Sequence, residues 1–384
     1  MSLVSLEFAI FFTGVALIYY RLPGRWRVGW LLAASYAFYA RWDIAYLPVL
    51  LALTALFYLV GGRIQTAATP GNRRRWLMLG VGLAISVLFG LQVTGVFVPI
   101  GISFYTFVGI AYLADCFRQQ TPPAPRPAQV ALLLAFFPTV TAGPIERAGK
   151  LLPQLAQTAV FDETRAIAAL RLILWGAFKK LVIADRLAIY VNAVYDQPQT
   201  YGGAVLLLAT VFYAFQLYAD FSGYSDVAVG VAKLLGIDLT QNFKQPYLAL
   251  SVRDFWTRWH ISLSGWIRDY LFMPLSRAGL RRTGGANARG VQAAANLSVM
   301  LLVGAWHGLT PPFIVWGALH GLYLSAESLL NLRVRNAKAP RYSQWARTLL
   351  TFALVTFAWI FFRASSLADA GDVLTGLLDW RAGV

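Results

Sequence analysis

The sequence predicts an all-α protein that crosses a membrane many times, and two observations support this prediction. Of its 384 residues, 58% are hydrophobic and only 13% are charged, whereas soluble domains carry roughly a quarter charged residues. The apolar residues also gather in near-continuous stretches, several of which approach the length of about 20 residues that a membrane-crossing helix needs. We therefore expect a single membrane domain over residues 1–384, with about ten transmembrane or re-entrant helices.

The expected helices follow one another along the chain. The longer apolar stretches are 5–20, 76–98, 128–143, 203–219, 295–307, 313–331 and 346–362. Shorter or interrupted stretches, which predict weaker spans, are 29–40, 45–61, 99–114 and 167–184. The first stretch has no basic leader and no small-residue cleavage site, so we expect it to remain as the first helix.

Arginines gather in three short connections, at 21–27, 63–75 and 118–126. The positive-inside rule makes these loops cytoplasmic, which places Met1 outside and predicts a helical hairpin over 29–61 with its turn near 41–43. Loop arginines next to lipid account for the net charge of +16, so we expect no nucleic-acid partner.

Polar residues crowd the segment 216–226 directly after an apolar stretch. Gln216, Asp220 and Asp226 lie there beside Gly223, where the backbone can break. Carboxylates at membrane depth must face protein or water, so the segment predicts a broken or re-entrant helix that lines a cavity. The alternative, in which Asp220 and Asp226 cap or pair at the membrane surface, stays open.

The segment 254–270, DFWTRWHISLSGWIRDY, places its aromatic residues near one helical face and its charges on others. This pattern predicts one interfacial helix with aromatic side chains toward lipid headgroups. His260 lies on neither face, and a lone histidine there is either a hydrogen-bonded structural residue or a catalyst.

His307 ends an apolar stretch, directly after Trp306 and shortly before a proline pair. A neutral imidazole at this depth suits a general base that takes a proton from a hydroxyl. A buried histidine with a hydrogen bond across helices is the alternative, and His320 on the next stretch fits both descriptions. Spacing alone does not rank the two.

The sequence contains no G-x-S-x-G elbow, no H-E-x-x-H pair and no phosphate-binding P-loop. With three histidines and one cysteine, we expect no metal site and no bound cofactor. A mechanism that rests on histidine remains.

Several motifs resemble those of one family in the same order along the chain. They are PIGISFYTF (99–107), AYLADCFR (111–118), FFPTVTAGPIER (136–147), ADRLA (184–188), QLYADFSGYSDVAVGVAKLLG (216–236), NFKQPYLALSVRDFWTRWHISLSGWIRDYLFMPL (242–275) and GAWHG with WGALHG (304–321). The chain resembles the membrane-bound O-acyltransferases and, among them, the bacterial branch typified by alginate O-acetyltransferases.

The resemblance implies a many-helix fold around a central tunnel, with His307 as the catalytic histidine and His260 as the supporting one. His320 is then a structural residue. We further expect a set of residues to support the site or line the tunnel: Asp254, Trp256, Asn242, Gln216, Asp220 and Trp306. Two departures stand out, namely Val108 in place of the usual glutamine and fewer C-terminal helices than in relatives.

The implied activity is transfer of an acyl group, expected to be acetyl from acetyl-CoA or another thioester, to a hydroxyl of an extracytoplasmic polysaccharide. The expected partners are membrane lipids, a periplasmic acetyltransferase or esterase-like protein and a polysaccharide synthase, and the expected location is a bacterial inner membrane. The alternative function is a conduit or transporter without covalent chemistry, in which the polar segment forms the pathway.

Overall fold

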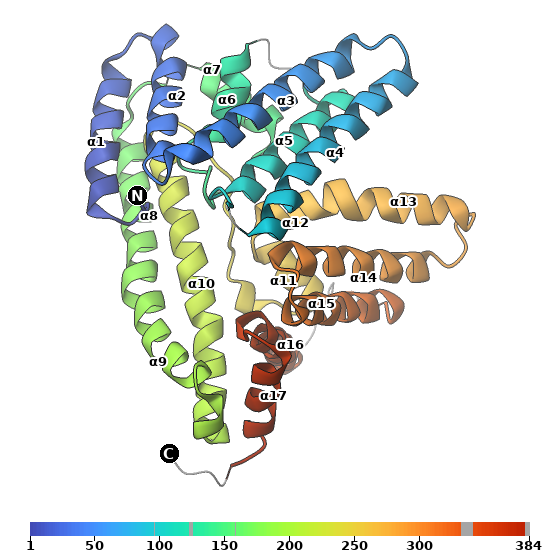
Figure 1. Ribbon diagram of the computed structural model, residues 1–384. Helices are drawn as coiled ribbons and strands as arrows, with labels where there is room; N and C mark the ends of the chain where they lie inside the picture. Colours follow the sequence, from blue (N-terminus) through green and yellow to red (C-terminus); the bar gives the residue numbers. More distant parts are fainter. Residues whose placement is uncertain (96, 123–125, 158, 332–340, 381–384) are drawn as a thin grey trace. The chain divides into compact units, whose positions relative to one another are not determined.

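The computed structural model describes residues 1–95, 97–122, 126–157, 159–331 and 341–380, and the regular elements of these residues are all helices (Figure 1). The chain divides into two compact units, residues 1–177 with 223–241 and residues 178–222 with 242–384. Five helical segments among the described residues are long and apolar enough to cross a membrane: Ile44–Thr66, Pro70–Thr94, Gly203–Leu234, Ala288–His307 and Tyr342–Arg363. The predicted all-α polytopic fold is confirmed, and the central tunnel stays a prediction.

The first unit contains most of the N-terminal helices. They are α1 (Leu6–Arg21), α2 (Gly24–Ala40), α3 (Leu47–Thr66), α4 (Pro70–Thr94), α5 (Ile102–Phe117), α6 (Pro127–Ala135), α7 (Ala148–Ala156) and α8 (Glu163–Phe178), which ends at the start of the second unit. Capping explains several starts, because the Ser5 and Thr69 side chains accept hydrogen bonds from backbone N–H groups in the first turns of α1 and α4. The expected hairpin over 29–61 corresponds to α2 and α3. Figure 1 shows the α1–α2 and α3–α4 connections, which carry arginines, on the upper side of this unit.

One expected span in the first unit is wrong. The apolar stretch 128–143 forms only the nine-residue helix α6, which ends at Ala135. Pro138 follows closely and disfavours helical backbone at the residue before it. Phe137 instead donates its backbone N–H to Ser35 Oγ (3.1 Å) and packs its ring among Phe8, Phe12 and Phe38. The stretch is apolar because protein buries it.

The predicted break at Gly223 is also wrong, because α10 (Gly203–Leu234) runs through it without interruption. A β-carbon at Gly176 of α8 would lie 2.6 Å from the carbonyl oxygen of Gly223, and one at Gly230 would lie 2.9 Å from that of Ala169. The glycines therefore let α8 and α10 approach closely, as small residues do between membrane helices.

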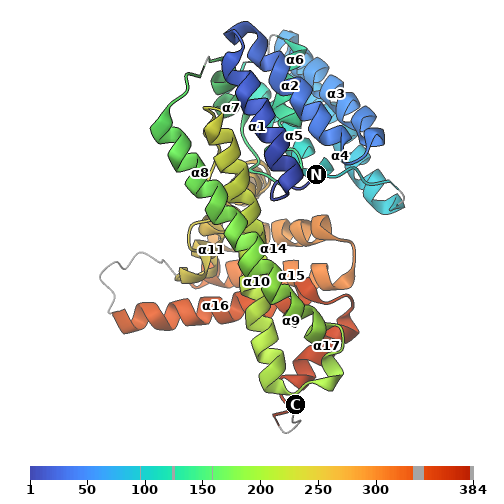
Figure 2. The ribbon, with the colours of Figure 1, turned by 90° about the vertical axis from the view of Figure 1, so that its left-hand side faces the viewer.

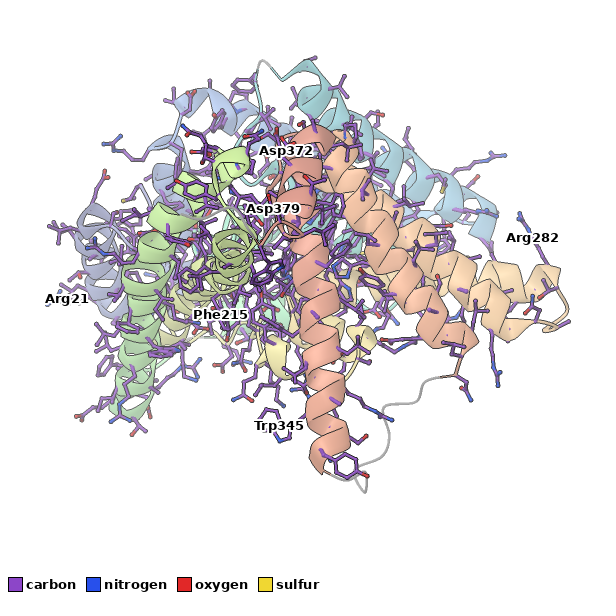
Figure 3. All side chains as sticks on the ribbon, turned by 90° about the horizontal axis from the view of Figure 1, so that it is seen from below. Arg21, Phe215, Arg282, Trp345, Asp372 and Asp379 are labelled. Carbon is purple, nitrogen blue, oxygen red and sulfur yellow. The ribbon has the colours of Figure 1, made fainter. Side chains whose placement is uncertain are left out.

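The second unit contains the remaining helices. They are two π-helical turns (Lys179–Ala184 and Arg268–Phe272), two 3₁₀ turns (Pro198–Thr200 and Pro246–Leu248), α9 (Asp185–Tyr195), the first part of α10, α11 (Val252–Arg258), α12 (Ile261–Ile267), α13 (Met273–Arg282), α14 (Ala288–His307), α15 (Pro311–Leu329), α16 (Arg341–Arg363) and α17 (Leu367–Gly376). Figures 1 and 2 show α9 beside α10, where Tyr195 and Thr210 share a hydrogen bond of 2.9 Å. Figure 3 shows Arg282 and Trp345 pointing outward from the ends of α13 and α16. The backbone N–H of Gly203 donates to Asp379, which ties α10 to the chain after α17.

The single interfacial helix expected over 254–270 is wrong in two respects. The chain forms two seven-residue helices, α11 and α12, which are separated at Trp259 and His260. The aromatic face is also buried in protein, because Phe255, Trp259 and Trp266 are 0%, 5% and 4% exposed. Helical periodicity detects an apolar face but does not distinguish lipid from protein as its neighbour.

Candidate active site

His260 occupies a strained turn between α11 and α12. Its backbone is left-handed, with φ 43° and ψ 56°, a conformation that costs a residue with a β-carbon about 1–2 kcal/mol. Such strain persists only where the surroundings impose it, and it concentrates at functional sites. The side chain is 4% exposed. Its ring meets the edge of Phe221 at 4.6 Å between centroids and stacks on Phe243 at 6.4 Å.

His260 is uncharged at neutral pH. Burial and, to a smaller extent, the charge of a protonated His307 lower the pKa of His260 from its ordinary value of 6.5 to about 3. A neutral imidazole can donate from one nitrogen and accept at the other, which suits it to orienting a reacting group.

Asn242 lies against this turn. It is 1% exposed, its carbonyl oxygen accepts the N–H of Ile261 (2.9 Å), and its side-chain Oδ1 accepts the N–H of Ser262 (3.1 Å). A further backbone bond joins Lys244 N–H to the carbonyl of Arg258 (2.9 Å). The segment that begins at Asn242 thus bonds to both sides of the His260 turn.

His320 is fully buried on α15, and the indole Nε1–H of Trp256 donates to its Nδ1 (3.3 Å). The rings of Trp316 and Tyr323 pack around it, with centroids at 5.1 and 5.9 Å. Because Trp256 is only a donor, Nδ1 of His320 carries no proton and its lone pair is occupied. This environment fits a structural histidine.

His307 is the last residue of α14, and its surroundings differ from those of the other two histidines. Its side chain is partly exposed, whereas those of His260 and His320 are buried. Aromatic rings surround it, with centroids at 4.4 Å for Trp306, 5.0 Å for Phe362 and 5.2 Å for Trp316. The hydrogen bonds of the described residues include none to the His307 imidazole. Its ring nitrogens are therefore available to a ligand.

Close packing of α14 on α15 fixes the position of His307. A β-carbon at Gly304 would collide with the carbonyl oxygen of Phe313, and one at Gly317 would collide with that of Met300. Ser325 Oγ also donates to the carbonyl of Ala293 (2.7 Å). The backbones of the two helices therefore touch one turn before His307.

Asp254 contacts its own helix. Its Oδ2 accepts the N–H of Leu250 (3.0 Å), its Oδ1 accepts from Arg258 Nε (2.9 Å), and its N–H donates to Ser251 Oγ (3.2 Å). Ser251 therefore caps the start of α11, and the Asp254 carboxylate bonds back to Leu250, the residue before the cap. Among the described residues, Asp254 bonds to neither His260 nor His307, so its place favours a structural role over orienting substrate.

Asp220 and Gln216 lie on α10. Among the described residues, neither forms a hydrogen bond or an ion pair with a histidine. Lys180, in the first π-helical turn, forms ion pairs with Asp220 (2.6 Å) and Asp185 (2.8 Å). Asp220 is therefore paired with a lysine of the neighbouring turn. Gln216 Oε1 is buried and accepts no hydrogen bond from the described residues.

Two elements of the site did not emerge from the sequence. Trp316 lies in edge contact with both His307 and His320, and its i, i+4 spacing from His320 was a signal for a shared face. Glu327, seven residues after His320, accepts the N–H groups of Val252 (2.7 Å) and Arg253 (3.2 Å) at the start of α11. The sequence signal for Glu327 was a carboxylate near the end of an apolar stretch.

Comparison with known proteins identifies the class of this fold and site. Residues 50–368 match the sequence model of MBOAT, the membrane-bound O-acyltransferase family. The chain belongs to this family and is a membrane O-acyltransferase. Family membership favours acyl transfer over the conduit.

Relatives narrow the comparison further. The chain is 39% identical to the probable alginate O-acetylase AlgI of Pseudomonas fluorescens over 92% of this chain and 70% of that protein. It is 38% identical to the probable alginate O-acetylase AlgI of Azotobacter vinelandii, over 94% and 75% of the two chains. It is 33% identical to the peptidoglycan O-acetyltransferase of Helicobacter pylori, over 91% and 73%.

Proposed function

We propose that this enzyme transfers an acetyl group from acetyl-CoA to a hydroxyl of an extracytoplasmic polysaccharide in the bacterial inner membrane. The names of its relatives support the acyl group and the acceptor class, since they include alginate O-acetylases and a peptidoglycan O-acetyltransferase. The apolar helices support the membrane location. The thioester donor and the expected protein partners come from the family resemblance.

The observation that carries the mechanism is the contrast among the three histidines. His307 alone is partly exposed, and its nitrogens make no hydrogen bond among the described residues. Nδ1 of His320 accepts from Trp256, and His260 is buried in its turn. We assign His307 as the general base and His260 as the residue that orients the reacting groups beside it.

The proposed step conserves atoms and electrons. The acceptor oxygen attacks the thioester carbonyl carbon, the hydroxyl proton moves to a ring nitrogen of His307, and the carbonyl π pair moves to oxygen. As the carbonyl re-forms, the C–S bond breaks with its pair on sulfur, and the thiolate takes the proton from His307. A base of this kind contributes about 10²–10⁴-fold to the rate.

The experiment that tests the acceptor uses purified protein in nanodiscs with radiolabelled acetyl-CoA. Label is followed into alginate, peptidoglycan fragments or a periplasmic acetyltransferase or esterase-like partner, each added separately. Label that appears on the glycan alone supports direct transfer, and label that requires the partner supports a relay. Acetyl-CoA that stays intact in every mixture would contradict acetyl-CoA as the donor.

A further inference from the structure

The His260 turn lacks the usual cap of a helix start. His260 holds the N-cap position of α12, yet its side chain makes no capping hydrogen bond. An N-cap residue normally supplies an oxygen to an N–H of the first turn. An imidazole that performs this task would not be free to face a reacting group.

The missing cap comes from a residue far away in the sequence. Asn242 Oδ1 accepts the N–H of Ser262 (3.1 Å) and its backbone oxygen accepts the N–H of Ile261 (2.9 Å). These are the two residues directly after His260. One asparagine therefore satisfies two N–H groups that a helix start leaves without partners.

The orientation of the Asn242 amide follows from this bond. Because Oδ1 accepts from Ser262, the amide nitrogen Nδ2 lies on the side away from this bond. Nδ2 is buried and donates no hydrogen bond to a described residue. The oxygen of Asn242 is thus the atom that bonds to the turn. An aspartate side chain at this position has the same shape. One of its oxygens would still accept the N–H of Ser262, whether the carboxyl group is protonated or ionised.

We infer that Asn242 is a positioning residue, which caps α12 in place of His260 and thereby holds the His260 imidazole in its left-handed turn. This inference rests on the proposed function, since it gives His260 a task in acyl transfer. The aromatic neighbours Phe221 and Phe243 then fix the ring.

The test compares Asn242→Leu, which removes the acceptor and keeps the branched outline of the side chain, with Asn242→Asp, which keeps the acceptor. Acetyl-CoA cleavage is measured in nanodiscs with both variants, in the native and the His260→Ala backgrounds.

A misplaced group typically lowers turnover by about 10²-fold, so Asn242→Leu should lower kcat to this extent with little change in KM. Asn242→Asp should restore kcat. In the His260→Ala background, Asn242→Leu should add no further loss, since residues that act through one group are non-additive.

Hydrogen exchange gives a readout that does not need activity. The amide of Ser262 should exchange about five- to tenfold faster in Asn242→Leu than in wild type or Asn242→Asp, as expected for a lost cap. Asn242→Ala replaces the leucine variant if the latter does not fold. The inference would be overturned by unchanged exchange in Asn242→Leu, or by a folded Asn242→Asp variant whose kcat is as low as that of Asn242→Leu. It would also be overturned by a fully active His260→Ala variant, or by losses of kcat that multiply when Asn242→Leu is combined with His260→Ala. Wild-type protein that leaves acetyl-CoA intact but shows the predicted exchange pattern would instead contradict the proposed function.

Discussion

The indole N–H of Trp256 donates to Nδ1 of His320 across 3.3 Å, which joins α11 to α15. Glu327, on the same helix as His320, joins the same pair of helices at the start of α11. These contacts hold the helix that leads into His260 against the helix that follows His307. The bond from Trp256 also occupies Nδ1, the nitrogen through which His320 could have accepted a proton.

Trp256→Phe should destabilise the protein by about 1–3 kcal/mol, because it leaves Nδ1 of buried His320 without a donor. The smaller ring also loses packing contacts, which adds to the destabilisation. Thermal unfolding in nanodiscs measures the effect, with Trp345→Phe as the control, since Trp345 is 64% exposed on α16. Equal melting temperatures for the two variants would contradict the role given to this bond.

Gly317→Ala should destabilise the α14–α15 pair and lower turnover, because its β-carbon would collide with the carbonyl of Met300, about two turns before the His307 end of α14. The matched control is Gly371→Ala in α17, where a β-carbon meets nothing within 4 Å. There the substitution should be neutral or stabilise by up to about 1 kcal/mol. Thermal unfolding of the two variants measures the difference in stability. A Gly317→Ala variant as stable as the control would contradict close packing at this position.

Acid should destabilise the native protein through His260. Its pKa is lowered from 6.5 in the unfolded chain to about 3 in the folded protein. Between these values the unfolded state binds the additional proton, so the free energy of unfolding falls as the pH drops below 6.5, by up to about 1.4 kcal/mol per unit. His260→Gln should lose less stability than wild type between pH 7 and pH 4.5. Parallel stability curves would show that His260 is not buried in its neutral form.

The sequence predicted those features that depend on local pattern. Apolar stretches placed α1, α4, α14 and α16, and the proline pair after His307 marked the end of α14 and the start of α15. The motifs around His260 and His307 indicated the family. Each of these signals lies within a short segment, where hydropathy and helix-stop residues act directly.

The features that the sequence did not predict depend on partners distant along the chain. Gly223 was interpreted as a break, but its meaning depends on Gly176 of another helix. The aromatic face of 254–270 was assigned to lipid, but it packs against Phe243, Tyr247 and Trp359. Spacing alone did not rank His307 over His320, and the bond from Trp256 supports the ranking that the family resemblance implied. Apolar patterns show that a face is buried without showing what buries it.

The most direct test of the account is acetyl-CoA cleavage by His307→Ala and His320→Asn in nanodiscs, with acceptor glycan and partner protein present. Asparagine at position 320 keeps an acceptor near the place of Nδ1, so the bond from Trp256 can persist. We predict that His307→Ala lowers kcat by about 10²–10⁴-fold with an unchanged melting profile, while His320→Asn stays close to wild type. Normal turnover by a folded His307→Ala variant would contradict the assignment of His307 as the general base.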